Sequence, residues 1–193
     1  METIILASGS PRRQELLSRA RIPFKAFPPS INEDAGRALG AAERVKLLAA
    51  QKIEKVVSLF KQESPRWVLG VDTLVELDGG VIDKPTGIED AERILRQLSG
   101  QLHRVYSGIG LLPSRGEELD LRCVCTEVKF IELSSKDIED YLLTSEWSAV
   151  AGAYRIQERG AFFVEWIKGS YSNVVGLPLE TFYAMLRRSS YPF

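Results

Sequence analysis

The stretch Ile4-Ile5-Leu6-Ala7-Ser8-Gly9-Ser10-Pro11-Arg12-Arg13 decides the fold class of this 193-residue chain. Ile4 to Leu6 is short, apolar and β-prone, which predicts a buried strand. The small residues Ala7 to Ser10 predict a loop. Ser10 is a favourable N-cap and Pro11 suits the first position of a helix. A strand that passes through a small loop into a helix indicates a protein of mixed α and β structure.

The same loop and helix start have the features of an anion-binding site. Unpaired backbone N–H groups point outward there, Ser8 and Ser10 add hydroxyl donors, and Gly9 lets a ligand approach the backbone closely. Arg12 and Arg13 oppose the helix dipole by roughly 0.3–1 kcal/mol each, whereas arginine binds phosphate oxygens bidentately. Two interpretations stay open: a phosphate site, or two solvated arginines. The motif is not a Walker A loop, because no Gly-Lys-Ser/Thr follows.

Hydrophobic periodicity predicts further strands and helices along the rest of the chain. Strands are expected at Lys25–Phe27, at Trp67–Val71 (ending at Asp72), near 103–112, near 121–133 and at 161–167. A hairpin over 74–82 should turn at Asp78-Gly79, and a second turn should span 113–118. Helices are expected over Ala41–Phe60, from a Thr86/Glu89 capping box to Gly100, over Ser135–Thr144 and over Leu179–Arg188.

Four charged residues are candidates for binding a metal ion or phosphate in a cleft. Asp72 follows an apolar run and Glu33 lies in a loop, so the two carboxylates could hold Mg²⁺ or Mn²⁺, or activate a water molecule. Each is also compatible with a turn cap or a solvated side chain. Lys52 falls on the apolar stripe of its predicted helix, where it must snorkel, pair or face a cleft. Lys84, before Pro85, could neutralise phosphate charge.

Composition excludes several classes of protein. The net charge is −1 and no run of Lys or Arg appears, which argues against nucleic-acid binding. No apolar run approaches the ~20 residues of a membrane span, and no signal peptide is evident. Cys123 and Cys125 are expected to be free thiols, which fits a cytoplasmic location. The lone His103 is interpreted as structural, and Phe162, Phe163 and Trp166 as core.

Five segments resemble the Maf family of nucleotide pyrophosphatases. They are Ile5 to Leu17, Gly70 to Val75, Lys84-Pro85, Ala151 to Gln157 and Gly169 to Leu179, and together they span nearly the whole chain. The resemblance implies one domain over 1–193 with a fold like that of inosine triphosphate pyrophosphatase: a long central mixed β-sheet flanked by helices, and two lobes around a cleft. The Gly-Ala-Tyr-x-Ile-Gln form is similar to the branch that cleaves dTTP and UTP.

The resemblance also implies a reaction and a set of residues. The expected reaction is metal-dependent hydrolysis of a nucleoside triphosphate to the monophosphate and pyrophosphate, with Mg²⁺ or Mn²⁺ held by Glu33 and Asp72, and a homodimer is compatible with it. Asp72 matches the proton acceptor of the family. Arg12, Thr73 and Gln157 match positions tied to substrate choice, and the other matching cleft residues are Ser8, Arg13, Glu33, Lys52 and Lys84. Asn32 departs from the usual pattern, where an aspartate is common.

Two rival functions remain at this stage. A nucleotidyltransferase can also place a small Gly/Ser loop and an arginine after its first strand, although its loop is normally richer in glycine. A non-catalytic nucleotide-binding regulator of cell division is the second rival, and the acidic residues argue against it because a phosphate binder gains nothing from neighbouring carboxylates.

Overall fold

The computed structural model describes residues 1–60, 65–114 and 117–193. These residues form two compact units. Unit 1 contains Met1–Asp72, Ser107–Val124 and Gly176–Phe193, and unit 2 contains Thr73–Tyr106 and Cys125–Val175. The seven strands found in the described residues belong to one mixed sheet of order β2-β1-β3-β5-β6-β7, with β4 paired to β3. The expected mixed α/β class with a central sheet and flanking helices is therefore confirmed.

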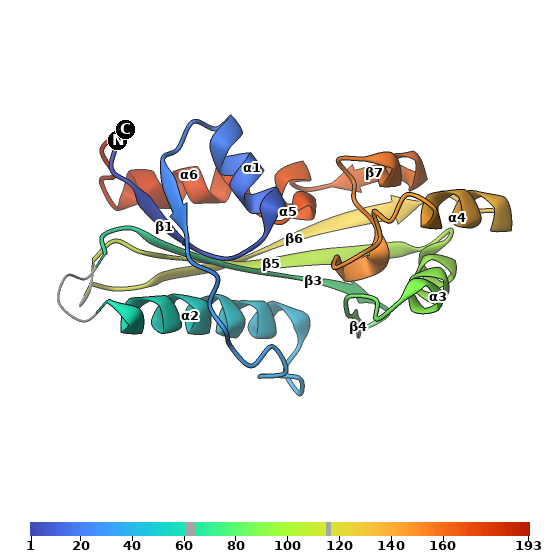
Figure 1. The fold of residues 1–193 in the computed structure, drawn as a ribbon, viewed down its shortest axis with the longest axis horizontal. Helices are drawn as coiled ribbons and strands as arrows, with labels where there is room; N and C mark the ends of the chain where they lie inside the picture. Colours follow the sequence, from blue (N-terminus) through green and yellow to red (C-terminus); the bar gives the residue numbers. More distant parts are fainter. Residues whose placement is uncertain (61–64, 115–116) are drawn as a thin grey trace. The chain divides into compact units, whose positions relative to one another are not determined.

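Unit 1 holds the N-terminal parallel strands and three long helices. β1 pairs in parallel with β2 and with β3, so Leu6 lies opposite Leu69, and the helices cover both faces of this part of the sheet. Figure 1 shows α2 on one face and α1 and α6 on the other. The elements are β1 (Ile4–Ala7), α1 (Pro11–Arg19), β2 (Phe24–Ala26), α2 (Ala41–Leu59), α6 (Leu179–Arg188) and parts of β3 (Val68–Leu77), β5 (Leu102–Leu112) and β6 (Asp120–Phe130).

The core of unit 1 explains why its elements form. The face of the sheet that carries α1 and α6 buries a cluster that includes Leu6, Leu69, Leu17 and Phe182. On the face that carries α2, Ile53 and Val56 pack on Ile5 and Val68. Each fully buried side chain of this size contributes roughly 1.5–3 kcal/mol, so these two layers hold α1 and α2 against the sheet.

Helix α2 lies unusually close to the sheet. A Cβ atom placed on Gly70 would stand 2.4 Å from the carbonyl oxygen of Ala49, and one placed on Gly108 would stand 2.1 Å from that of Val45. Only glycine permits such an approach of two backbones. The side chains of α2 therefore reach the strands over a short distance.

Unit 2 contains the remaining strands and helices that the structure describes. The β3–β4 hairpin pairs Val75 with Ile82 and turns at Asp78 and Gly79, both at positive φ, as a tight hairpin requires. His103, Phe130 and Tyr154 pack edge to face in its interior. The elements are the remaining parts of β3, β5 and β6, together with β4 (Gly80–Ile82), α3 (Ile88–Leu98), α4 (Ser135–Leu142), η1 (Ala151–Ala153), η2 (Arg159–Phe163), β7 (Val164–Lys168) and α5 (Tyr171–Val175).

Several sequence expectations need correction. The third strand does not end at Asp72 but continues to Leu77, because Leu74 and Val75 are buried and the strand goes on to pair with β4. The Thr86/Glu89 capping box is wrong: α3 begins at Ile88, and the backbone and hydroxyl of Thr86 donate to Asp90.

Differences also occur at other elements. Residues 159–163 form a 3-10 turn before β7, so the strand expected from 161 starts three residues later. Ser10 is the N-cap of α1, but its side chain makes no capping hydrogen bond. The expected turn at 113–118 lies partly outside the described residues.

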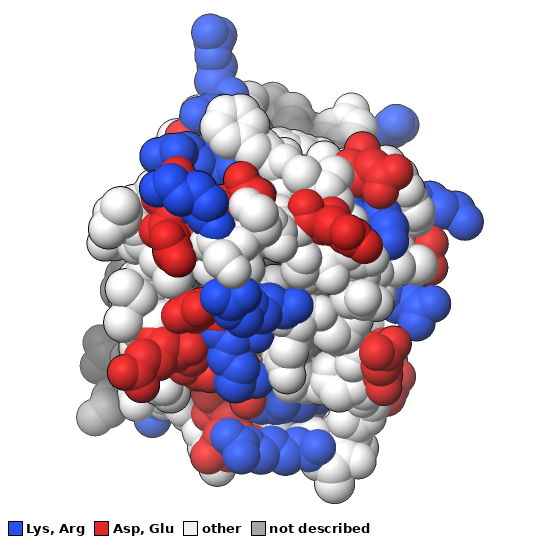
Figure 2. All heavy atoms as spheres, turned by 90° about the vertical axis from the view of Figure 1, so that its right-hand side faces the viewer, with Lys and Arg blue, Asp and Glu red and all other residues white. Residues whose placement is uncertain are grey.

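Smaller expectations have mixed outcomes. Cys123 and Cys125, both within the described residues, form no disulfide, and His103 is buried and hydrogen-bonded to Tyr154, as expected. Phe163 is in the core, whereas Phe162 is 74% and Trp166 41% exposed, so the core assignment of these two was wrong. No helix among the described residues is long and apolar enough to cross a bilayer. Acidic and basic side chains are interspersed on the face shown in Figure 2.

Candidate active site

The first turn of α1 contains a buried arginine rather than two solvated ones. Arg13 is 8% exposed, and its Nη1 donates to the Ser8 hydroxyl at 2.8 Å while its Nε donates to the carbonyl of Gly176 at 2.8 Å. Ser8 is itself 4% exposed. Arg12 is half-buried in the first turn of the same helix. The interpretation of two solvated arginines is therefore wrong for Arg13.

Gly176 orients this guanidinium from the far end of the sequence. Its φ of 121° is a backbone conformation that residues with a Cβ rarely adopt. The carbonyl of this glycine is the acceptor for Arg13 Nε. The sequence showed this glycine only within a family motif, and nothing in its spacing predicted a contact with Arg13.

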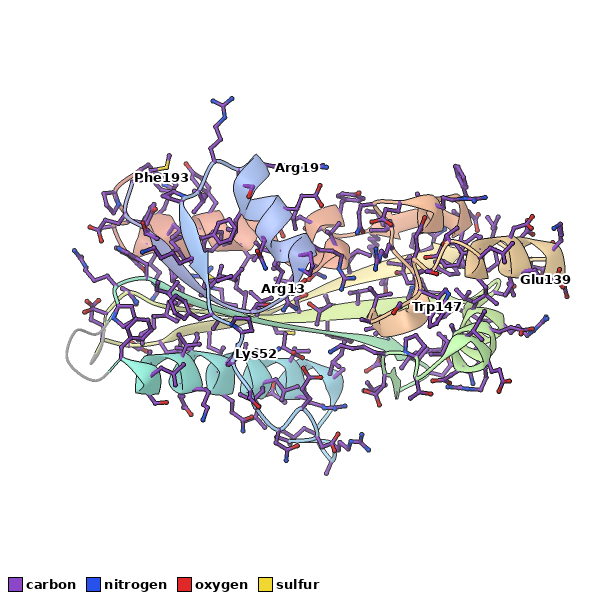
Figure 3. The ribbon with its side chains drawn as sticks, in the orientation of Figure 1. Arg13, Arg19, Lys52, Glu139, Trp147 and Phe193 are labelled. Carbon is purple, nitrogen blue, oxygen red and sulfur yellow. The ribbon has the colours of Figure 1, made fainter. Side chains whose placement is uncertain are left out.

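Lys52 and Asp72 form a buried ion pair. The Lys52 ammonium donates to Asp72 Oδ1 at 2.5 Å and to the Val71 carbonyl at 3.3 Å. Both side chains are about one-tenth exposed. Lys52 therefore does not snorkel to solvent but pairs with β3 from α2. Figure 3 shows Lys52 on α2 and Arg13 on α1, which cover opposite faces of the sheet.

The charges of this cluster act on one another. Burial lowers the pKa of Arg13, while Asp72 and Glu33 raise it. Burial also lowers the pKa of Lys52; Asp72 raises it, Arg13 lowers it and Glu33 raises it. Glu33 is exposed, in the loop before α2. The structure thus brings Ser8, Arg13, Lys52 and Asp72 together in unit 1 with Glu33 close enough to act on the two cations.

Three predicted site residues belong to unit 2. Thr73 follows Asp72 directly in β3 and is half-buried, as is Gln157 after η1, whereas Lys84 is exposed after β4. Their roles stay predictions.

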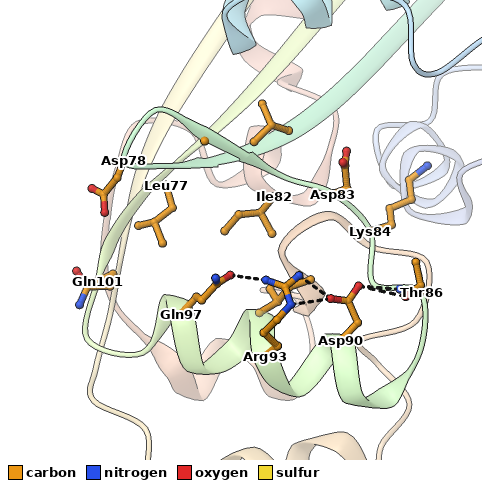
Figure 4. A pocket seen from close by; sticks show the side chains of 13 residues that line it. Leu77, Asp78, Ile82, Asp83, Lys84, Thr86, Asp90, Arg93, Gln97 and Gln101 are labelled. Atoms are coloured by element: carbon orange, nitrogen blue, oxygen red, sulfur yellow. Dashed lines mark hydrogen bonds and ion pairs between the residues drawn. The ribbon is translucent and has the colours of Figure 1, made fainter. Parts of the chain in front are cut away.

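Unit 2 also has a groove of about 730 Å³ between the β3–β4 hairpin and α3. Asp90 pairs with Arg93, which in turn donates to Gln97, so the charged groups at its wall are satisfied by one another (Figure 4). Lys84 lines this groove, but its side chain points away from Asp90 and Arg93 in Figure 4. Asp78 and Asp83 also line the groove, so its charged lining is more acidic than basic and does not favour a polyanion.

A divalent metal fits the charged cluster only together with a substrate. Within the described residues no group of three or more His, Cys, Asp or Glu side chains could hold a metal ion. Asp72 and Glu33 are two carboxylates, and Mg²⁺ is commonly bound by one or two carboxylates plus substrate phosphates. The donor set is compatible with Mg²⁺ or Mn²⁺ on that condition.

One residue of this region was missed. Arg44, in the first turn of α2, is 5% exposed, and its Nη2 donates to the Glu33 carbonyl at 3.1 Å. A cation in the first turn of a helix, next to the apolar Val45, was the available signal. Arg12 and Arg13 gave the same signal, a positive charge near a helix N-terminus that opposes the helix dipole.

The mixed sheet and the buried charged cluster define a protein of the α/β class with a candidate anion-binding site built from Arg13 and Lys52. Residues 3–189 match the sequence profile of the family described as Maf-like protein, and the chain belongs to this family. The expected family resemblance is confirmed.

Curated relatives agree in length. The dTTP/UTP pyrophosphatase of Dictyoglomus thermophilum is 40% identical over 189 residues, covering 97% of this chain and 96% of its own. That of Salmonella typhimurium is 44% identical over 186 residues, covering 96% and 92%. Among solved structures, the Ham1 protein of Staphylococcus aureus aligns with 68% of this chain and 73% of its own, at 14% identity and a TM-score of 0.47.

Proposed function

We propose that this chain hydrolyses a nucleoside triphosphate, dTTP or UTP, to the monophosphate and pyrophosphate. The full-length similarity to relatives named dTTP/UTP pyrophosphatases supports the substrate class. The observation that carries the proposal for this chain is the buried cluster of Arg13, Lys52 and Asp72. Burying two cations and one carboxylate costs free energy unless a further anion compensates them.

The cations hold the triphosphate in this proposal. Ser8 and Gly176 orient the Arg13 guanidinium at the start of α1, where its positive charge can bind phosphate oxygens. Arg12, in the same helical turn, and Lys84 add positive charge. Thr73 and Gln157 supply the polar groups that discriminate between bases, because a site that hydrogen-bonds a base edge rejects analogues strongly.

Asp72 is the proton acceptor. Lys52 occupies its Oδ1, so Oδ2 is the oxygen that accepts a proton from the attacking water. The water oxygen bonds to the α-phosphorus, the bond from that phosphorus to the bridging oxygen of the β-phosphate breaks, and pyrophosphate leaves. Glu33 and Asp72 would hold Mg²⁺ or Mn²⁺ together with phosphate oxygens. The ion's chemistry when bound is to neutralise and polarise those oxygens.

The test is a panel of nucleoside triphosphates with pyrophosphate detection, in Mg²⁺ and in Mn²⁺, without any acceptor substrate. Pyrophosphate release from dTTP and UTP above the other nucleotides is expected. Release only after an acceptor is added would indicate a nucleotidyltransferase, and binding without turnover would indicate a regulator; either result contradicts the proposal.

Asp72→Asn gives the matched test of the proton acceptor. Removal of a positioned general base costs about 10²–10⁴-fold in rate. Asp78→Asn is the control, because Asp78 is an exposed residue of the hairpin turn, where asparagine is equally favourable. Equal rates for the two variants would remove Asp72 from this role.

A further inference from the structure

Arg44 is a buried cation in an unfavourable position. It lies in the first turn of α2, where the helix dipole disfavours positive charge, and only 5% of it is exposed. The neighbouring Lys46 shows the ordinary arrangement, with its ammonium 2.8 Å from the exposed carboxylate of Glu43. Arg44 therefore needs an explanation that Lys46 does not.

The hydrogen bonds of Arg44 do not offset the free-energy cost of burying its guanidinium. Its Nη2 donates to the backbone carbonyl of Glu33 at 3.1 Å, and its Nε is buried without a partner. No ion pair joins Arg44 to a carboxylate within the described residues. A buried guanidinium held by one carbonyl, with one N–H left unpaired, loses more free energy by desolvation than it regains. Stabilisation of the fold is thus a poor reason for this residue.

The hydrogen bond of Arg44 is placed where it fixes one functional segment. The loop before α2 folds into a turn in which Asn32 Oδ1 accepts from the Asp34 backbone N–H, 3.0 Å away. Gly36, at a φ of 71°, brings the chain back onto α2, and a Cβ there would stand 2.9 Å from Leu47. Arg44 joins the centre of this turn, at Glu33, to the helix.

Burial does not fix the position of the Glu33 carboxylate, because this residue is exposed. Its charge nevertheless acts on both Arg13 and Lys52. The geometry points to Arg44 as a positioning residue: it holds the Glu33 backbone so that the carboxylate stays beside the two cations. The positioning of Glu33 rests on the observed hydrogen bond from Arg44. Its importance for catalysis rests on the proposed function.

A double-mutant cycle tests whether Arg44 acts through Glu33. Arg44→Gln should lower kcat/KM by about tenfold to a hundredfold, because misplacement by an ångström has effects of that size. In a Glu33→Gln background the same change should alter kcat/KM by less than about twofold. Arg44→Lys, which keeps one donor, should retain more activity than Arg44→Gln. Equal losses in both backgrounds would show a merely structural role and overturn the inference.

Hydrogen exchange measures the placement without turnover. Amides of residues 30–39 should exchange at least about tenfold faster in Arg44→Gln than in the unaltered protein, while those of the rest of α2 stay unchanged. Arg37→Gln is the control, because Arg37 is an exposed arginine of the same loop and pairs with the exposed Asp34. Unchanged exchange in Arg44→Gln would overturn the inference even in an active enzyme. An unaltered chain without pyrophosphatase activity would contradict the proposed function instead.

Discussion

Lys52 shows how a single side chain links the stability of this protein to its chemistry. It crosses from α2 to β3 and meets Asp72 where both are nearly excluded from solvent. A pair of this kind gives little net stability, but removal of one partner leaves the other charge buried and uncompensated. The same proximity keeps the Asp72 carboxylate in one orientation.

Lys52→Met should therefore destabilise the protein by about 3 kcal/mol, measured by urea unfolding. The double variant Lys52→Met/Asp72→Asn should recover part of this loss, because no unpaired buried charge remains. Lys46→Met, on the same helix, is the control and should change stability by less than about 0.5 kcal/mol, because its ion pair with Glu43 is exposed. A loss of equal size in Lys46→Met would contradict this account.

His103 gives a pH dependence with a definite sign. Burial lowers its pKa to about 4, and its Nε2 is hydrogen-bonded to the Tyr154 hydroxyl at 2.9 Å. In the unfolded chain the imidazole has a pKa of about 6.5. Between these values the unfolded state binds a proton that the folded state does not. The contribution of neutral His103 to the free energy of unfolding is therefore fully present above about pH 6.5 and is lost as the pH is lowered to about 4.

The size of this effect is about 3 kcal/mol, from a difference of about 2.5 in pKa. His103→Gln keeps a side chain able to hydrogen-bond Tyr154 but does not titrate. The free energy of unfolding of this variant should fall less than that of the unaltered protein between pH 6.5 and 4. Parallel curves for the two proteins would show that His103 does not contribute.

At the scale of elements, the turn at Gly176 orients Arg13, a site residue that is far from it in sequence. Gly176, just after α5, has the φ of 121° that aims its carbonyl at Arg13. Gly176→Ala should cost roughly 1–3 kcal/mol of stability and raise the KM for the nucleotide. Gly87→Ala is the control, because Gly87 is extended and has open space around it. An unchanged KM in Gly176→Ala would argue against the role of this carbonyl.

The elements also show what the sequence could and could not predict. Long amphipathic segments were predicted well: α6 has the expected bounds, and α2 ends one residue earlier than expected. The short elements failed, since α5 is too brief for a period to appear and η2 replaces the start of a predicted strand. Asp72 appeared to end a strand because a charged residue rarely lies inside one, but Lys52 compensates its charge there.

The sequence singled out the residues of the candidate site but not their contacts. Arg13 is hydrogen-bonded to Ser8, Lys52 is paired with Asp72, and the charge of Asp72 acts on Arg13. The acceptor role of Gly176 and the burial of Arg44 depend on residues far apart in sequence or on burial, and a local pattern carries neither. Thr73, Lys84 and Gln157 remain predictions from the family.

On the scale of the whole molecule, ligand binding should raise the stability of the protein. A nucleotide that binds only the folded state contributes about 2.7 kcal/mol at a concentration of 100 times Kd. For a chain of this length that corresponds to a rise in Tm of about 5–10 °C. A non-hydrolysable dTTP analogue should produce this shift, and Arg13→Gln should abolish most of it. A full shift in Arg13→Gln would contradict the role of the N-terminal cluster.

The close contact between α2 and the sheet at Gly70 and Gly108 has a consequence for anyone who maps this protein by mutagenesis. An added methyl group at either position would need about an ångström of extra room, and the helix that carries Lys52 would have to move to provide it. Substitution of either glycine should thus reduce activity in a mutational scan as strongly as substitution of a residue of the candidate site, although neither glycine is charged. The two glycines set the distance between the helix and the sheet, and activity data alone would misidentify them as catalytic residues.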